Sequence, residues 1–136
     1  MPNRFSRVSL ERLAGCHWAL QDLCHAVIHK HDCTIVYGKR TMAEQQRLVA
    51  EGLSKTMNSK HLEQEDGSSW AVDVAPYPID WNNTKRFYYF AGMMLALAPI
   101  YLPEGYTLRW GGDWDMDNDL DDQTFMDLVH FELRKT

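Results

Sequence analysis

The stretch that decides the fold is Trp-Ala-Val-Asp-Val-Ala-Pro, residues 70–76. It has the alternation of a half-buried β-strand, and it is rich in the residue types that strands favour. Pro76 ends the strand, because proline has no N–H to donate to a neighbouring strand. The stretch therefore predicts one strand of a sheet, with Asp73 near its middle.

Downstream of this strand, the pattern predicts one helix and two more strands. The helix is expected from about Asn83 to Leu97, where Pro99 closes it. The two strands are expected at Leu108–Trp110 and Leu128–Leu133. Gly111-Gly112 and a strongly acidic loop separate them.

Upstream of the strand, a first helix is expected from Leu10 to Val27, because apolar residues recur there in steps of three and four. Ser9 is its expected N-cap, and His17 lies in the apolar face as a hydrogen-bonded core histidine. A strand over Cys33–Tyr37 follows. The spacing of Thr41 and Glu44 then predicts a capped second helix that stops at Gly52.

Together these elements predict an α+β fold, in which helices pack on a small antiparallel sheet. The 136 residues, 45% of them hydrophobic, fit a single domain over residues 1–136. A net charge of -5 without a basic block argues against a nucleic-acid partner. The apolar run Phe87–Leu102 is broken by Gly92 and Pro99, so it reads as a core helix and no membrane partner is expected.

Three further expectations follow from the composition. The cysteines Cys16, Cys24 and Cys33 form no C-x-x-C pair and are expected to be reduced. No apolar core of an export signal follows the N-terminal residues, so synthesis without a signal peptide is expected. We also expect a monomer.

Metal chemistry is suggested by three potential ligands on three different elements. A catalytic zinc needs three nitrogen or oxygen ligands on rigid elements and a fourth, open position. The helical H-E-x-x-H motif is absent. The sequence instead offers His61 at the end of a polar loop, Asp73 in a strand and His130 in the last strand, although composition alone does not single out this set.

A resemblance to a known family does single it out. Ser59–His61 followed by Ala71–Pro76 resembles the S-x-H…A-x-D motif of the D-alanyl-D-alanine carboxypeptidase and L-alanyl-D-glutamate endopeptidase family, and Asp127–His130 matches its closing D-x-x-H. Gly38–Thr41 with Glu44-Gln45 is similar to the family's G-x-R-T…E-Q stretch, and Arg109–Trp114 to its F/W-G-G-D-W stretch. The five motifs occur in family order and cover most of the chain. The resemblance implies a zinc peptidase fold of the D-Ala-D-Ala carboxypeptidase and Hedgehog-like type.

One departure from the family concerns the spacing of the first two ligands. The family places its aspartate seven residues after the first histidine, whereas Asp73 follows His61 by twelve, with Glu63–Ser69 inserted. Ser69 stands where the family has glycine. Asp66 lies in the insertion and is the competing ligand, but a strand residue holds a ligand more rigidly than a polar loop does. Asp73 is therefore preferred.

Carried over to this chain, the resemblance implies that zinc is bound by His61, Asp73 and His130, and that Asp127 is the general base and acid. Asp127 and His130 are three apart, so regular alternation would place them on opposite faces, and we expect a turn or bulge at Asp127. Arg40 is the expected partner of a substrate carboxylate or an oxyanion, with a surface ion pair to Glu44 as the alternative.

Other residues are expected near the substrate. Ser59 either binds substrate or orients His61, and Gln45 and Trp110 are further candidates for substrate binding, although packing in the core or at the rim is the alternative for Trp110. Glu132 is a candidate partner of His130, with a solvated edge charge as the alternative.

The acidic loop after Gly112 resembles the odd-position oxygen pattern of a calcium site. The pattern comprises Asp113, Asp115, Asp117, Asp119 and Asp121. Position six is Asn118 where an EF-hand has glycine, and position twelve is Thr124 where it has glutamate. The loop is therefore not an EF-hand, and the alternatives are a divergent Ca²⁺ site and a solvated acidic loop.

The resemblance implies hydrolysis of peptidoglycan stem peptides, preferably as an L-alanyl-D-glutamate endopeptidase of phage endolysin type. Such an enzyme would be made in the host cytoplasm and would reach the wall through a holin-made hole. The alternatives are a D,D-carboxypeptidase or dipeptidase of cell-wall metabolism, and a non-catalytic wall-binding module with the same fold.

Overall fold

The computed structural model describes residues 3–54, 56–123 and 125–136, so Thr124, the twelfth position of the acidic loop, lies outside the described residues. Four helices and four strands occur in this part of the chain. In chain order they are α1 (Arg7–Leu13), α2 (Trp18–Ile28), β1 (Cys33–Tyr37), α3 (Met42–Ala50), β2 (Ala71–Pro76), α4 (Thr84–Tyr101), β3 (Tyr106–Gly111) and β4 (Asp127–Lys135).

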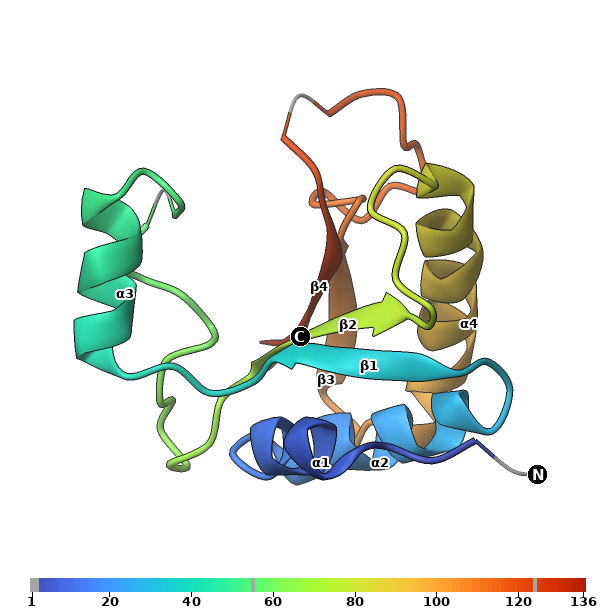
Figure 1. Ribbon diagram of the computed structural model, residues 1–136, viewed down its shortest axis with the longest axis horizontal. Coiled ribbons are helices and arrows are strands. Elements are labelled where there is room, and N and C mark those ends of the chain that lie inside the picture. Colours follow the sequence, from blue (N-terminus) through green and yellow to red (C-terminus); the bar gives the residue numbers. More distant parts are fainter. Residues whose placement is uncertain (1–2, 55, 124) are drawn as a thin grey trace.

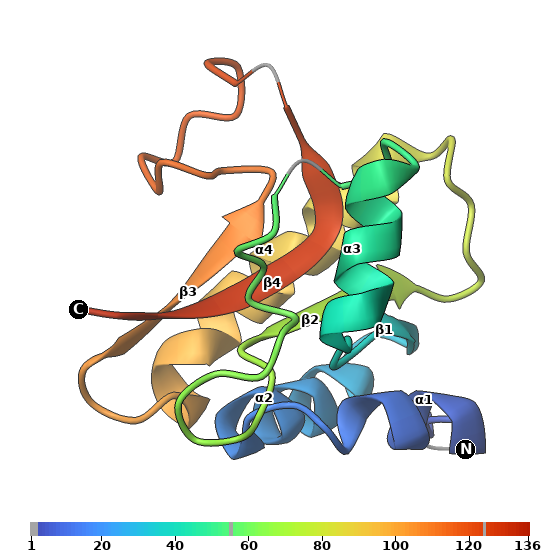
Figure 2. The same cartoon turned by 90° about the vertical axis from the view of Figure 1, so that its left-hand side faces the viewer.

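The four strands form one antiparallel sheet in the order β1-β2-β4-β3. Helices α1, α2 and α4 lie on one side of the sheet, and α3 stands apart on the other (Figure 1). After a quarter turn, α3 is in front of the strands and α4 is behind them (Figure 2). The predicted α+β class with an antiparallel sheet is confirmed.

The hydrophobic core lies between the sheet and the helices α2 and α4. Leu20 and Leu23 of α2, Phe90 of α4, and Val72 and Phe131 of the sheet are all inaccessible to solvent or nearly so. Burial of this apolar area is the main driving force for folding. Among the described residues, no helix is long and apolar enough to cross a membrane.

The first predicted helix is in fact two helices. Helix α1 ends at Leu13, and His17 is the N-cap of α2, where its Nδ1 accepts the backbone N–H of Ala19 at 3.0 Å. His17 is therefore a buried, hydrogen-bonded histidine, as expected, but it begins a helix instead of continuing one. The predicted N-cap was also wrong, because Ser6 caps α1 and the Ser9 hydroxyl accepts the N–H of Ile35 in β1.

The predicted end of α4 was too early. Pro99 lies within the helix, which continues to Tyr101. Proline removes one backbone hydrogen bond, and in the last turn that loss is small enough for the helix to finish.

Helix α3 begins as predicted. The Thr41 side chain accepts the N–H of Glu44, and the Glu44 carboxylate accepts the N–H of Thr41, which is a complete capping box. Gly52, with φ +75°, follows the end of the helix, where the left-handed backbone favours glycine.

Candidate metal centre and active-site cleft

Three potential ligands converge at the middle of the sheet. Asp73 of β2 and His130 of β4 are paired across the two strands, and His61 comes from the loop that precedes β2. Asp73 Oδ1 lies 3.1 Å from His61 Nε2 and 3.3 Å from His130 Nδ1. All three side chains are buried, and their ligand atoms lie within 4.8 Å of one another.

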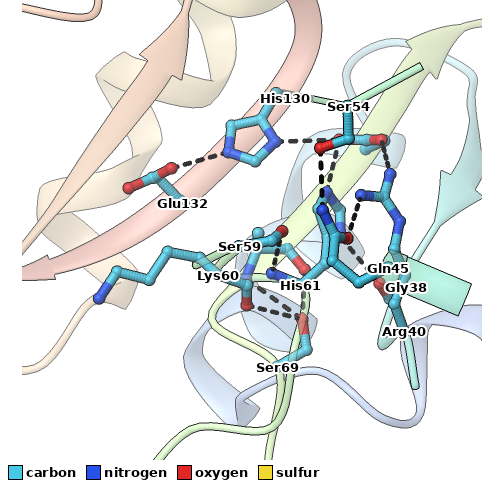
Figure 3. Close-up of polar contacts among 12 residues, drawn as sticks. Gly38, Arg40, Gln45, Ser54, Ser59, Lys60, His61, Ser69, His130 and Glu132 are labelled. Carbon is cyan, nitrogen blue, oxygen red and sulfur yellow. Dashed lines mark hydrogen bonds and ion pairs between the residues drawn. The ribbon is translucent and has the colours of Figure 1, made fainter. Parts of the chain in front are cut away.

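The outer nitrogen of each histidine is held by an oxygen. His61 Nδ1 lies 2.8 Å from the carbonyl oxygen of Gly38, and His130 Nε2 lies 2.8 Å from Glu132 Oε1 (Figure 3). A carbonyl oxygen can only accept, so His61 carries its proton on Nδ1, and Nε2 is left with a free lone pair. The Glu132 carboxylate favours the corresponding arrangement in His130. Both inner nitrogens are therefore directed at the same carboxylate oxygen.

This arrangement fits a zinc ion. Ligands held about 2.0–2.1 Å from zinc in a tetrahedron are roughly 3.3 Å apart, close to the two separations found here. Two lone pairs facing one carboxylate need a positive charge between them, which either protons or a metal ion can supply. The two imidazoles and one carboxylate form a donor set that suits Zn²⁺.

The pKa shifts in the cluster reflect the same need for positive charge. Burial lowers the pKa of His130, but its hydrogen bonds with Asp73 and Glu132 outweigh burial and raise the pKa to about 9. Burial raises the pKa of Asp73, but the hydrogen bonds from His130 and His61 outweigh it and hold that pKa well below its usual range. Asp73 is thus a carboxylate at any physiological pH.

Asp127 reaches the same cleft through an irregularity in β4. Trp110 pairs with Phe131, but the next residue, Gly111, pairs with Asp127, so three residues of β4 have no partner on β3. The expected irregularity is present, although Asp127 is the first residue of β4 and does not lie before the strand. Burial and the charge of Asp73 raise the pKa of Asp127.

Gly111 makes this irregularity possible. A Cβ atom there would lie 2.1 Å from the backbone oxygen of Asp127, which no side chain permits. Gly38 is required for a similar reason, since its Cβ would lie 1.8 Å from the backbone oxygen of Arg12. Two glycines thus set the backbone beside Asp127 and beside the carbonyl that orients His61.

Arg40 lies on the side of the cluster nearest α3. Its guanidinium is 3.7 Å from Asp73 Oδ2, and its NH1 donates to Gln45 Oε1 at 3.2 Å. Its Nε is buried without a hydrogen-bond partner. Arg40 lines the cleft, and no ion pair with Glu44 occurs among the described residues, in contrast to the alternative considered above.

Gln45 is fully buried, and its amide is committed to other protein groups. Its Nε2 donates to Ser54 Oγ at 2.8 Å and to the Thr56 carbonyl at 2.7 Å, while Oε1 accepts from Arg40 (Figure 3). It does not line the cleft. The expectation that Gln45 binds substrate directly is therefore corrected, because this side chain instead contacts Arg40, Ser54 and Thr56.

On the opposite side of His130, Glu132 bridges two residues. Its Oε1 accepts from His130, and its Oε2 accepts from Arg109 NH2 at 2.9 Å. Glu132 is buried, so it is the partner of His130 and not a solvated edge charge. Arg109 was not expected in the site, although its register opposite Glu132 is the signal that would have placed it there.

The cleft is a hollow of about 400 Å³ over this cluster. Of the remaining expected residues, Ser59 lines it, and the Ser59 hydroxyl accepts the backbone N–H of His61 at 3.1 Å. Trp110 does not line it. Its ring is buried in the core and its Nε1 donates to the Leu128 carbonyl, so the expected substrate contact is replaced by packing. Trp114 lines the cleft instead, with its ring 5.3 Å from that of His130.

The inserted residues form a closed loop beside the site. The N–H of Trp70 donates to the Lys60 carbonyl at 2.9 Å, and Ser69 exchanges backbone hydrogen bonds with Gly15 and His17. Asp66 accepts from Ser68 and from Trp70 Nε1, and it is not part of the ligand cluster. The loop thus closes on itself and leaves Asp73 at the centre of the site.

The acidic loop gathers some of its carboxylates. Ligand atoms of Asp113, Asp115 and Asp117 lie within 4.8 Å of one another, whereas Asp119 and Asp121 are outside this group. Asn118 has φ 65°, so it adopts the left-handed backbone for which an EF-hand uses glycine.

Comparison with known proteins agrees with the geometry. Residues 1–134 match the family model described as phage L-alanyl-D-glutamate peptidase. The chain belongs to this family. It is 30% identical over 131 residues to the L-alanyl-D-glutamate peptidase of Escherichia phage T5, covering 90% of each chain. The crystal structure of the Serratia marcescens L-Ala D-Glu endopeptidase ChiX is similar, with a TM-score of 0.73 and 25% identity over 97% of this chain and 91% of that one.

Family membership explains why the five sequence motifs meet in one place. The residues quoted for the resemblance supply the His-Asp-His cluster, Asp127 and Arg40, which come together around a single cleft. Membership of this peptidase family therefore accounts both for the fold and for the polar side chains buried beneath the cleft.

Proposed function

We propose that the chain is a zinc endopeptidase that hydrolyses the L-alanyl-D-glutamate bond of peptidoglycan stem peptides. His61, Asp73 and His130 hold the metal, and Asp127 is the general base and acid. The observation that carries the proposal is the buried His-Asp-His cluster, with both outer nitrogens held by oxygens and a carboxylate beside it in a family of L-alanyl-D-glutamate peptidases.

The chemistry needs an activated water and a proton carrier. When bound, the ion supplies Lewis-acid activation of the water and of the scissile carbonyl. Asp127 accepts the proton of the attacking water and passes it to the leaving amine of the D-glutamyl residue. Its raised pKa suits a group that must both take up and release a proton.

Arg40 is the residue that binds negative charge in this reaction. Its buried Nε has no hydrogen-bond partner, and the guanidinium borders the cleft next to Asp73. A planar guanidinium suits either a substrate carboxylate or the oxyanion formed during attack. Ser59 orients His61 from the loop side through its bond to the His61 backbone.

Two other functions are less well supported. A D,D-carboxypeptidase or dipeptidase would use the same ligands, but the matched family model and both relatives described above are named for the L-alanyl-D-glutamate bond. A non-catalytic wall-binding module has no need of a buried ligand cluster with a carboxylate of raised pKa beside it.

We also propose a biological setting, which similarity to phage peptidases supports. The enzyme acts as a monomeric phage lysin, without a nucleic-acid or membrane partner, and it reaches the wall from the host cytoplasm through a holin-made hole. Peptidoglycan is its partner.

A calcium ion is proposed for only three of the five aspartates of the alternating pattern, namely Asp113, Asp115 and Asp117. Asp113 is buried, and its Oδ1 has no hydrogen-bond partner. Oxygen ligands of this kind suit Ca²⁺. In calorimetry with millimolar CaCl₂, Asp113→Asn should abolish binding and Asp121→Asn should not; the absence of any heat with the unmodified chain removes this idea.

The bond is identified by mass spectrometry of purified peptidoglycan after digestion. Two products are expected: a peptide with a new N-terminal D-glutamyl residue, and a glycan strand on which each cleaved stem is reduced to a single L-alanine. Both should disappear after chelation of the metal. Release of D-alanine alone would establish the carboxypeptidase instead. Full activity after complete chelation would refute the zinc mechanism.

A further inference from the structure

A second hollow adjoins the catalytic cleft and has no role in the chemistry above. It measures about 550 Å³ and lies between the inserted loop and the end of β4. Lys60 lines both this hollow and the cleft, so the two are neighbours that share this residue. Figure 3 shows the Lys60 side chain extending away from His61 and Ser69.

The lining of the hollow holds three cations (Lys60, Arg134 and Lys135) and two carboxylates (Glu63 and Glu65), although the chain as a whole carries a charge of -5. The ammonium groups of Lys60 and Lys135 lie 5.4 and 5.6 Å from the centre of the Trp70 ring. Lys135 is paired with Glu65, and the Glu63 carboxylate is paired with Lys39. Among the described residues, neither Lys60 nor Arg134 forms an ion pair, which leaves two uncompensated cations.

The position of Arg134 on β4 shows how far the hollow lies from the metal cluster, where the scissile bond is expected. His130 and Glu132 line the cleft, while Phe131 and Leu133 are buried in the core, so alternation places Arg134 on the cleft side of β4. At about 3.3 Å per residue, Arg134 is roughly 13 Å along the strand from His130. An extended peptide covers the same distance in about four residues.

We propose that this hollow is a subsite for the C-terminal carboxylate of the stem peptide, bound by Lys60 and Arg134. The subsite rests on the proposed function, because the metal cluster marks where the scissile bond lies. The carboxylate at the end of an L-alanyl-D-glutamyl tetrapeptide is three residues beyond that bond, or about 10–11 Å of extended chain, and the length of the Arg134 side chain can make up the difference. A stem whose terminal carboxyl group is consumed in a cross-link lacks this charge, so the enzyme prefers stems that are not cross-linked through it.

Two synthetic substrates test the subsite: an L-alanyl-D-glutamyl stem tetrapeptide with a free C-terminal carboxylate, and the same peptide as its C-terminal amide. The unmodified enzyme should cleave the acid with a kcat/KM about three- to tenfold higher, mainly through KM, as expected for two partly exposed ion pairs. The difference should shrink in high salt. Equal cleavage of the two peptides would overturn the subsite.

Two double variants locate the effect. Lys60→Met with Arg134→Gln should abolish the preference for the acid, measured as the ratio of kcat/KM for the acid to that for the amide in the same variant. Lys85→Met with Arg4→Gln removes the same charge from exposed positions outside both hollows and should keep the preference. If the first pair keeps the preference as well, Lys60 and Arg134 do not form the subsite.

Binding of the cleavage product separates this proposal from the proposed function. The peptide that begins with D-glutamate can be titrated as acid and as amide by calorimetry, without turnover. Tighter binding of the acid, lost in the Lys60 and Arg134 variant, supports the subsite even if the L-alanyl-D-glutamate bond is not the one cleaved. Cleavage of that bond without any preference for the acid leaves the function intact and refutes the subsite.

Discussion

Helices α2 and α3 are attached to the molecule in opposite ways. Helix α2 buries six residues, all of them apolar: Ala19, Leu20, Leu23, Cys24, Val27 and Ile28. Helix α3 buries only one residue, Gln45, which is polar. Helix α2 is held by packing, whereas α3 is held by a capping box and by the hydrogen bonds of the Gln45 amide.

This difference divides the cleft into two walls. The sheet wall carries Asp73, Asp127 and His130 on strands backed by the core, so it keeps its geometry. The helix wall consists of Arg40, which precedes α3, and the loop that follows α3; neither these residues nor α3 itself belongs to the core cluster. Segments with few apolar contacts open locally at lower free energy than the core does. Two of the three proposed metal ligands, Asp73 and His130, therefore lie on the rigid wall, whereas His61 and Arg40 come from segments outside the sheet.

The largest effect is expected from removing a ligand on the sheet wall. Asp73→Ala should lose zinc and all measurable activity, because no other carboxylate in the described cluster can replace it. Asp66→Ala is the matched control, since it removes the competing carboxylate of the inserted loop and should keep one zinc per chain. Metal analysis of the two purified variants decides the matter, and the reverse pattern would move the ligand to the insertion.

The next effect concerns proton transfer on the same wall. Asp127→Asn should lower kcat by roughly a hundredfold or more, because the amide cannot accept the proton of the attacking water. Zinc content and thermal stability should stay near those of the unmodified enzyme. Loss of zinc would reassign Asp127 as a ligand, and full activity would mean that the base is another residue.

The two walls can then be compared directly with one substitution in each. Leu23→Ala in α2 should cost about 2–5 kcal/mol of global stability, as expected for a buried leucine. Gln45→Ala in α3 removes three hydrogen bonds, yet it should reduce global stability little and lower kcat/KM about tenfold through misplaced Arg40. Hydrogen exchange should show faster opening in α3 alone. Uniformly faster exchange in the Gln45 variant would show that α3 does not open separately but unfolds together with the core.

The smallest expected effect is a pH dependence of the stability of the metal-free protein, which arises from His130 on the sheet wall. The pKa of His130 is raised from 6.5 to about 9, so its stabilising contribution is complete below pH 6.5 and is lost as the pH rises towards 9. The lowered pKa of Asp73 contributes stability that is lost only in acid. A bound metal replaces the proton, so the Tm should fall between pH 6.5 and 9 with chelator and change little with zinc. An equal fall in both samples would assign the titration to groups elsewhere.

The contrast between the walls also explains which parts of the structure the sequence could predict. The capping box of α3 was correct because Thr41 and Glu44 interact with each other and with little else. The break between α1 and α2 was missed because the apolar spacing runs through it. What breaks the helix is distant in sequence: Ser69 hydrogen-bonds to the backbone of Gly15 and His17.

The same limit applies to the site. Residues that define motifs, such as His61, Asp73 and Asp127, could be named in advance through resemblance. Gln45 belongs to a motif too, but its burial and its three partners emerge only when the loop folds back on α3. Arg109 and Lys60 were left without a role because strand register and a shared hollow assign their positions.

The closed loop between His61 and Asp73 has a consequence for how such enzymes diversify. Because the backbones of Lys60 and Trp70 are hydrogen-bonded to each other, the chain that enters the loop and the chain that leaves it are fixed side by side. The number of residues in between can then change over evolutionary time without altering the separation of the two ligands. Inserted loops of different lengths can then furnish different neighbours for the substrate around the same pair of ligands.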